Sequence, residues 1–387
     1  MDYGIIDCHA HIFPPAASAA GFPDVATHLL HQQRSMHMHG NQPYRRSRDR
    51  SIVTDRPLWD PGDPSPKGRR DVNFRVGRHG RYEWTVGGED QYVQFLAPWM
   101  DRLEMPAETL LAYMDYAGVA TAVLQNEHIY GNLAADFAAA AKSHPGRFIG
   151  LAQVEEAFAY TDAELERLAD ETGRLGMAGF YFTTTGLFRS GYAPMHSDAA
   201  YDPYWAFVEK TGLPVFWVQS GSSPVGSYED EMRHLARIVE RFPGIRHLLV
   251  HGVPTALYAD DKDRLKLPSI LETLLGEAPV SAEILYPIAW GGRQEYPYHR
   301  AHTHIRQLLD RFGASRFLWG SDAPNVDRYC TYAQSLTYFT QHADYMSAAD
   351  RRAILCDNAR ALIPALARPD ERADGTVAAG GREGRSG

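Results

Sequence analysis

Two histidines separated by one residue lie close to the N-terminus, in the segment Asp7-Cys8-His9-Ala10-His11. Alternate residues of a β-strand point to the same face, so His9 and His11 are expected to project together from the end of a first strand. Two imidazoles placed in this way can bind one divalent metal ion. The alternative is a pair of hydrogen-bonded polar residues at a strand end. Cys8 is expected on the opposite face, as a buried thiol that binds no metal.

A carboxylate and a third histidine end two other predicted strands. Asp322 follows the apolar run that begins at Phe317, and its carboxylate can bind a metal or act as a general base. His251 ends another such run and can orient or deprotonate water, or protonate a carbon atom. The alternatives are a helix cap for Asp322 and a hydrogen bond to a loop for His251. His247 shares a face with His251 but lies deeper, where a structural role is expected.

The segments that must position these side chains alternate between strand and helix patterns. Predicted strands cover residues 4–11, 119–125, 148–154, 178–182, 214–219, 247–251, 280–285 and 317–322. Predicted helices cover residues 107–118, 133–144, 162–175, 201–211, 229–242, 268–275, 304–312, 331–342 and 348–366. This alternation implies parallel strands joined by right-handed crossovers. Eight strands of this kind predict an α/β protein with a closed (β/α)8 TIM barrel.

The region 12–106, after the first strand, does not follow this alternation and is rich in Arg, His, Pro and Gly. Alternating runs at 73–76 and 82–86 flank a Gly-containing turn and predict a β-hairpin. So long a connection is usually functional, and we expect a lid or an arm of a dimer. We predict one domain over residues 1–367, which includes this insertion, and a disordered tail over residues 368–387.

The composition limits the classes of partner. The 387-residue chain has a formal net charge of -9 at pH 7, whereas nucleic-acid-binding proteins usually carry a basic surface. Its three cysteines are too few for a disulfide framework, and the N-terminus lacks the pattern of a signal peptide. No apolar stretch reaches the ~18 residues of a membrane span. These features predict a cytoplasmic protein that binds neither nucleic acid nor membranes.

Taken together, the motifs resemble those of the amidohydrolase superfamily, in the amidohydrolase-2 branch that includes aminocarboxymuconate-semialdehyde decarboxylase. The resemblance runs from residue 1 to about residue 367, apart from the insertion. The supporting motifs lie at residues 7–11, 114–119, 212–215, 242–244, 251–252, 320–322 and 357–359. The first motif and the one that contains Asp322 are the most specific. The resemblance implies a TIM-barrel enzyme with its active site at the carboxyl ends of the strands.

The resemblance also implies one divalent metal ion, often zinc in this branch. The matching ligands are His9, His11 and Asp322, and His251 matches a histidine that acts in catalysis. A further ligand histidine is expected at the end of strand five, where this chain has Gln219. An amide oxygen is a poorer zinc ligand than an imidazole. Three alternatives therefore stay open: a loosely held metal, another group in the ligand shell, or a site that works without metal.

Substrates of the resembled branch are small aromatic or unsaturated acids. Three arginines, Arg189, Arg293 and Arg300, are expected on loops near the carboxyl ends of the strands, where their guanidinium groups would suit a carboxylate. For each arginine alone, a solvated surface position is the alternative. Trp290 and Gln219 are further candidates for substrate contact.

For several other polar and aromatic residues, a role in the site is weighed against a structural or surface role. Glu283 is either an inward catalytic group or a paired carboxylate. Trp319 is expected in the barrel core. The histidines at positions 299, 302 and 304 are expected as a surface cluster that precedes a helix.

The sequence therefore predicts a metal-dependent non-oxidative C–C lyase, a decarboxylase of a small aromatic or unsaturated acid. The alternative is a hydrolase of a lactone, an amide or a C–C bond in a related acid. For this hydrolase, a reaction without metal stays open. A non-catalytic binding protein on a decayed barrel is a third possibility, favoured only by Gln219. A homodimer is expected, because relatives use the insertion in a dimer interface. The candidate interface arginines are Arg45, Arg46, Arg48, Arg69 and Arg70.

Overall fold

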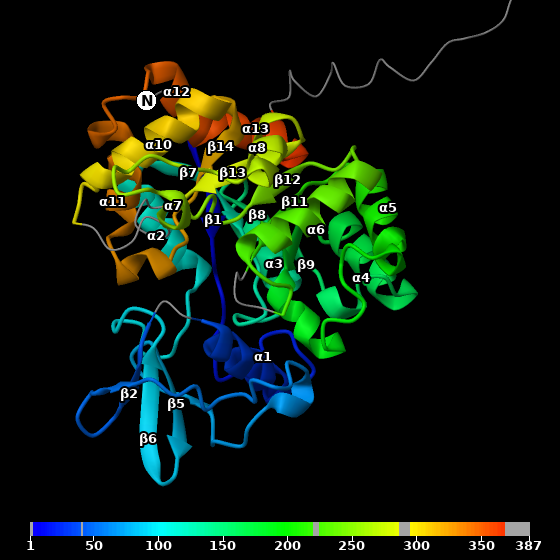
Figure 1. The fold of residues 1–387 in the computed structure, drawn as a ribbon, viewed down its shortest axis with the longest axis vertical. Coiled ribbons are helices and arrows are strands. Elements are labelled where there is room, and N and C mark those ends of the chain that lie inside the picture. The colour runs from blue at the N-terminus through cyan, green and yellow to red at the C-terminus, as the bar shows by residue number, and fades with distance from the viewer. Residues whose placement is uncertain (1–2, 40–41, 220–223, 286–294, 368–387) are drawn as a thin grey trace, which may run out of the picture.

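The computed structural model describes residues 3–39, 42–219, 224–285 and 295–367. The predicted disordered tail lies outside these ranges, as do Trp290 and Arg293. Two parallel sheets make up the wall of the barrel (Figure 1). One sheet contains β1 (Ile5–Ala10), β7 (Val119–Leu124) and β8 (Phe148–Gly150). The other contains β9 (Ala152–Gln153), β10 (Phe180–Thr183), β11 (Val215–Val218), β12 (His247–Leu249), β13 (Val280–Ile284) and β14 (Phe317–Trp319).

Backbone hydrogen bonds connect the two sheets at both of their edges. At one edge the chain passes from β8 to β9 through Leu151, and the N–H of Ala178, just before β10, donates to the carbonyl of Gly150 in β8 at 2.8 Å. Beyond the ends of β14 and β1, the N–H of Asp322 donates to His9 O at 2.7 Å, and that of His11 donates to Ala323 O at 2.8 Å. The eight predicted strand positions are thus all present, and the predicted (β/α)8 TIM barrel is confirmed.

Most helices lie within a few residues of the predicted bounds. They are α2 (Ala107–Ala117), α3 (Ala134–Ser143), α4 (Asp162–Gly173), α5 (Asp202–Thr211), α6 (Tyr228–Arg241), α8 (Ser269–Gly276) and α10 (His299–Phe312). The predicted helix over 331–342 is α11 (Tyr332–Thr337) followed by a π-helix, and the one over 348–366 is divided into α12 (Ala348–Arg352), a π-helix, α13 (Asn358–Leu362) and a 3-10 helix. The short helix α7 (Thr255–Tyr258) was not predicted. Helix α2 ends at Gly118, whose φ of 75° is the left-handed conformation that glycine adopts most easily. No helix in the described part of the chain is long and apolar enough to cross a membrane.

One predicted helix start was wrong. Helix α10 begins at His299 and not at His304, so the three histidines lie within its first turns rather than before it. His304 is also buried, and its Nδ1 lies 3.2 Å from Thr255 Oγ1. His304 thus packs between α10 and α7. Of the expected surface cluster, only His299 is exposed and His302 is partly exposed.

The core contains the residues for which burial was expected. Cys8 is fully buried and packs in a cluster with Cys356 on the outer side of the strands. Trp319 is also fully buried. Trp217 is buried, and its Nε1 donates to His247 Nδ1 at 2.8 Å, so the structural role expected for His247 is confirmed.

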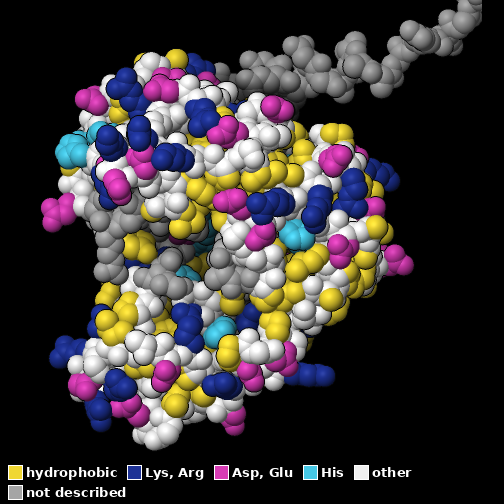
Figure 2. Space-filling view, viewed as in Figure 1, with side chains coloured by type: hydrophobic (Ala, Val, Ile, Leu, Met, Phe, Trp, Pro, Cys, Tyr) yellow, Lys and Arg dark blue, Asp and Glu magenta, His cyan; other side chains and the backbone are white. Residues whose placement is uncertain are grey.

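The insertion forms a separate lobe beside the barrel (Figure 1). It contains α1 (Val25–Met38) and an antiparallel sheet of β3 (Ile52–Val53), β2 (Tyr44–Arg46), β6 (Glu89–Gln94), β5 (Arg81–Val86) and β4 (Arg75–Val76), in that order. The predicted hairpin is confirmed by the pairing of β4 with β5. Figure 2 shows a hollow between this lobe and the barrel, with histidine side chains inside it.

Helix α1 was not predicted, and its buried face explains why. Six of its residues are buried, and five of them are polar: His28, His31, Gln32, Gln33 and Arg34. A helix that turns polar side chains inward shows no apolar periodicity in the sequence.

Candidate active site

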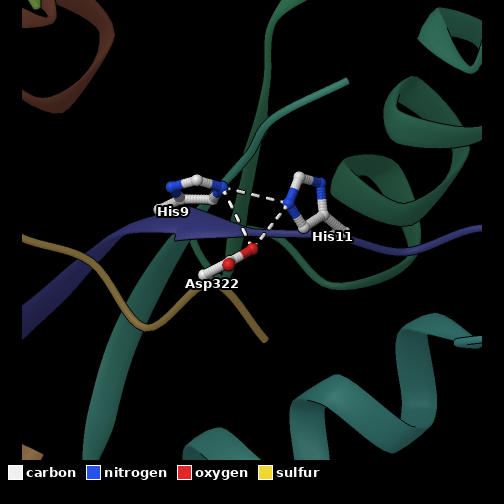
Figure 3. Close-up of side chains that lie close together, drawn as sticks. All are labelled: His9, His11 and Asp322. Carbon is white, nitrogen blue, oxygen red and sulfur yellow. Dashed lines mark hydrogen bonds and ion pairs between the residues drawn. The ribbon is translucent and has the colours of Figure 1, made fainter. Parts of the chain in front are cut away.

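Two histidine side chains at the end of β1 and a carboxylate that follows β14, more than 300 residues later in the chain, converge at one point (Figure 3). His9 Nε2 and His11 Nε2 lie 3.0 Å apart. Asp322 Oδ1 lies 3.4 Å from the first of these atoms and 3.2 Å from the second. All three side chains are buried. The predicted grouping of His9, His11 and Asp322 is therefore confirmed, and we call it the triad.

The other ring nitrogens of both histidines face acceptors. His11 Nδ1 lies 2.8 Å from the carbonyl oxygen of Gln125, and His9 Nδ1 lies 2.9 Å from Glu283 Oε2. A carbonyl oxygen only accepts, so the Nδ1 of His11 carries the proton and, in the neutral ring, its Nε2 presents a lone pair. A histidine that donates its second nitrogen to a carbonyl or carboxylate in this way is typical of a metal ligand.

The triad fits a small divalent cation. Four ligands placed tetrahedrally at a zinc–nitrogen distance of about 2.0–2.1 Å lie about 3.3 Å from one another. The three separations within the triad are 3.0, 3.2 and 3.4 Å. Two imidazole nitrogens and a carboxylate oxygen are also a donor set that suits zinc and other transition metals.

Close backbone contacts bring the two strands together. A Cβ atom on Gly320 would lie 2.5 Å from His9 Cβ, so a larger residue at this position would force β14 away from β1. Asp322 has a φ of 58°, a left-handed conformation that aspartate tolerates better than most residues. His251 is also left-handed, with a φ of 66°. Such conformations cost free energy and are concentrated at functional sites.

Glu283 contacts both His9 of the triad and the backbone of His251, the other catalytic candidate. Its Oε2 accepts from the backbone N–H of His251 at 2.9 Å, and its Oε1 accepts from Gln125 Nε2 at 2.7 Å. The ring of His251 lies 5.4 Å from that of His9, centroid to centroid. Glu283 is therefore an inward carboxylate that is paired, and it positions His9 and the backbone of His251.

The histidines of the site differ in pKa and therefore in charge at neutral pH. Burial and, to a lesser degree, the charge of the neighbouring His9 lower the pKa of His251 to about 4, so His251 is neutral near pH 7. Burial also lowers the pKa of His11. For His9, burial opposes the charge, but Glu283 and Asp322 outweigh it and raise the pKa to about 9. Asp322 is also desolvated, yet His9 and His11 hold its pKa well below the usual range.

A second group of metal-ligand residues lies beside α1 but is less suited to an ion. Ligand atoms of His31, His128 and Glu155 lie within 4.8 Å of one another. However, the two imidazole rings are stacked, with an interplanar angle of 17° and centroids 4.6 Å apart. The lone pairs of stacked rings lie side by side and do not meet at one point. In addition, His128 Nε2 is paired with Glu156 at 2.6 Å.

The family model described as Amidohydrolase matches residues 6–365, nearly the whole chain. The chain belongs to the amidohydrolase family. Membership identifies it as an amidohydrolase-type enzyme, and the family is generally metal-dependent, in agreement with the triad.

Solved structures agree with this amidohydrolase assignment at the level of the fold. A Pseudomonas putida protein assigned as a 2-pyrone-4,6-dicarboxylic acid hydrolase is 24% identical, with a TM-score of 0.52 over 67% of this chain and 87% of that chain. An amidohydrolase II is 14% identical, with a TM-score of 0.52 over 93% of this chain and 99% of that chain. No curated protein matches the chain.

The remaining predicted site residues of this amidohydrolase lie in three different settings. Gln219 directly follows β11 and is buried, and its Nε2 has no hydrogen-bond partner among the described residues. Arg189 belongs to a 3-10 helix and pairs with Glu155 at 2.9 Å. Arg300 lies in α10, pairs with Asp263 at 2.7 Å and is largely exposed. The expectation that both arginines lie on loops was wrong, and neither contacts the triad in the described structure.

Sequence reasoning missed several polar residues around the triad. Asn325 Nδ2 donates to Asp322 Oδ1 at 2.7 Å and to the hydroxyl of Tyr130 at 2.8 Å, and the Tyr130 ring lies 4.7 Å from that of His11. Burial raises the pKa of Glu127 to about 7, and the charge of Asp322 contributes to the rise. A signal was present: the polar run from Gln125 to His128 directly follows an apolar strand, the position where TIM barrels carry catalytic residues.

Proposed function

We propose that this amidohydrolase is a metal-dependent, non-oxidative C–C lyase that decarboxylates a small aromatic or unsaturated carboxylic acid, with zinc as its metal. The observation that carries the proposal is the convergence of two imidazole nitrogens and one carboxylate oxygen, at 3.0–3.4 Å from one another. A divalent ion held by His9, His11 and Asp322 would act as a Lewis acid toward the oxygen atoms of a bound acid.

Decarboxylation breaks the bond between a carbon atom and its carboxylate, and that carbon takes up a proton as carbon dioxide leaves. Glu127 suits the delivery of this proton, because a carboxyl group with a pKa of about 7 is partly protonated at neutral pH. His251 suits the opposite task. A neutral imidazole can orient a bound substrate or accept a proton.

The same property of His251 favours the second candidate, hydrolysis of a lactone, an amide or a C–C bond in a related acid. A neutral imidazole whose ring lies 5.4 Å from that of His9 can accept a proton from an attacking water molecule. The two reactions differ in their products, since only decarboxylation releases carbon dioxide.

Product analysis tests the proposal. The protein, loaded with zinc, would be incubated with 2,6-dihydroxybenzoate, 5-carboxyvanillate and 2-pyrone-4,6-dicarboxylate, the compounds that occur in the names of structural relatives. We expect release of carbon dioxide from at least one aromatic acid, loss of activity on chelation and recovery on adding zinc. Ring opening without carbon dioxide would favour the hydrolase. Full activity after exhaustive chelation would refute metal dependence.

A further inference from the structure

Tyr130, in the loop that follows β7, places a buried hydroxyl group near the triad. The side chain is 4% exposed. Its ring stacks on that of Phe13 from the insertion, with centroids 4.3 Å apart and an interplanar angle of 15°, and it lies 4.7 Å from the ring of His11. These two contacts hold the ring. They also fix the position of the hydroxyl oxygen, because that oxygen lies on the long axis of the ring.

Asn325 connects this hydroxyl to the triad. Its Nδ2 donates to Asp322 Oδ1 at 2.7 Å and to the hydroxyl oxygen of Tyr130 at 2.8 Å. The carboxylate of Asp322 decides the orientation of the amide, since a carboxylate oxygen accepts and only the amide nitrogen can donate to it. An amide nitrogen carries two hydrogen atoms, and these two bonds use both of them. Tyr130 is therefore an acceptor toward Asn325.

The hydrogen atom of the Tyr130 hydroxyl is consequently left without an acceptor. This hydroxyl forms no other hydrogen bond with the residues that the structure describes. It lies within two hydrogen-bond lengths of Asp322 Oδ1, the oxygen that faces both histidines of the triad. A buried donor without an acceptor is costly, and its presence beside a site indicates a bound molecule as its partner.

The chemistry of the triad indicates which acceptor this hydroxyl would meet. A phenol keeps its proton at neutral pH, so the hydroxyl is a donor. A divalent ion held by two imidazoles and one carboxylate retains positive charge, which favours an anionic ligand. A carboxylate carries lone pairs on two oxygen atoms, so one group can meet both the charge of the site and a hydroxyl donor beside it.

We propose that the hydroxyl of Tyr130 donates a hydrogen bond to a carboxylate oxygen of the acid that binds at the triad. The inference rests on the proposed function for the statement that the ligand is an acid. It assigns Tyr130 to substrate binding and Asn325 to the orientation of Asp322. It also gives the insertion a role in this site, because Phe13 holds the ring of Tyr130.

Tyr130→Phe tests the proposal, since it removes the hydroxyl and keeps the ring that stacks on Phe13. Calorimetric titration of the zinc-loaded, full-length protein with benzoate would compare the variant with wild type. We expect benzoate binding to weaken about 10-fold or more, as for the loss of a hydrogen bond to a charged acceptor. Zinc affinity, measured by competition with a chelator, should change by less than about threefold, because the three metal ligands are untouched.

Tyr44→Phe is the matched control. Tyr44 is also 4% exposed, but its hydroxyl already donates to the backbone carbonyl of Met36 within the insertion. This variant should leave both affinities unchanged. Equal benzoate affinities of wild type and Tyr130→Phe would overturn the proposal, as would the absence of benzoate binding by zinc-loaded wild type. Weaker zinc binding with unchanged benzoate affinity at saturating zinc would also overturn it, because the hydroxyl would then only support Asn325.

A crystal structure of zinc-loaded wild type with benzoate decides the question if Tyr130→Phe does not fold. We expect a carboxylate oxygen within hydrogen-bond distance of the Tyr130 hydroxyl, and a water molecule as its sole partner would overturn the proposal. These results are separable from the proposed reaction. Turnover absent from every tested acid, with Tyr130-dependent benzoate binding retained, overturns the reaction alone. Turnover retained, with equal benzoate affinities of wild type and Tyr130→Phe, overturns the role of Tyr130 alone.

Discussion

Nδ1 of His9 and Oε2 of Glu283 lie 2.9 Å apart, although the two residues are 274 positions apart in the chain. The contact joins β1 to β13, two strands between which β14 lies in the barrel wall. The same carboxylate oxygen accepts from the backbone N–H of His251. One buried carboxylate thereby fixes the ring orientation of a proposed metal ligand and the backbone of a proposed catalytic histidine.

Replacement of this carboxylate should weaken metal binding without removing a ligand. We expect Glu283→Gln to lower zinc affinity by about 10- to 100-fold, the range found when the partner of a ligand histidine is changed. Competition titration with a zinc chelator measures the effect. Glu277→Gln, an exposed residue just before β13, is the control. Unchanged zinc affinity in Glu283→Gln would mean that the His9 ring is held by other contacts.

His251→Ala should reduce kcat more than it reduces metal content, because the residue is assigned to proton transfer and lies outside the triad. General acid–base groups contribute about 10²- to 10⁴-fold to rate. Steady-state kinetics and elemental analysis of the same preparation check this. If metal is lost and activity returns on adding excess metal, His251 is a ligand instead.

Asp322→Asn should abolish turnover and leave the fold intact, since the amide cannot supply the negative charge that faces both histidines of the triad. Circular dichroism and the thermal midpoint report on the fold, and product formation reports on turnover. A kcat close to that of wild type would contradict both roles assigned to this carboxylate.

Gln219→His should tighten zinc binding if Gln219 is a weak ligand, because imidazole is a better donor to zinc than an amide oxygen. If Gln219 contacts substrate instead, the variant should keep its zinc affinity and show a raised KM. Zinc titration and kinetics on one preparation distinguish these outcomes. No change in either quantity would remove Gln219 from the site.

Glu127 should make stability depend on pH. Burial raises its pKa in the folded protein from an ordinary value of 4.5 to about 7. The folded state therefore binds a proton that the unfolded state has released between these pH values, and stability falls as the pH rises from about 4.5 to about 7. The loss contributed by this group is up to about 3 kcal/mol. Denaturant titrations at pH 5 and pH 8 should show a smaller pH effect in Glu127→Gln than in wild type. An equal effect would contradict the raised pKa.

The sequence alone determined the barrel and the triad, because both follow from local patterns. Helix and strand periodicities give the eight units, and a His-x-His at one strand end meets an Asp from the last strand once a parallel barrel closes. The family likeness rests on the same motifs. The predicted hairpin also depended only on a turn and two alternating runs.

Tertiary structure decided what local patterns do not contain. The partner of His9 is Glu283, whose role as an inward catalytic group or a paired carboxylate the sequence left open. Helix α1 carries polar residues on its buried face, so apolar periodicity could not reveal it. The arginines expected on loops, Arg189 and Arg300, lie in helices and pair with Glu155 and Asp263, because ion pairs between distant segments are a property of packing and not of sequence spacing.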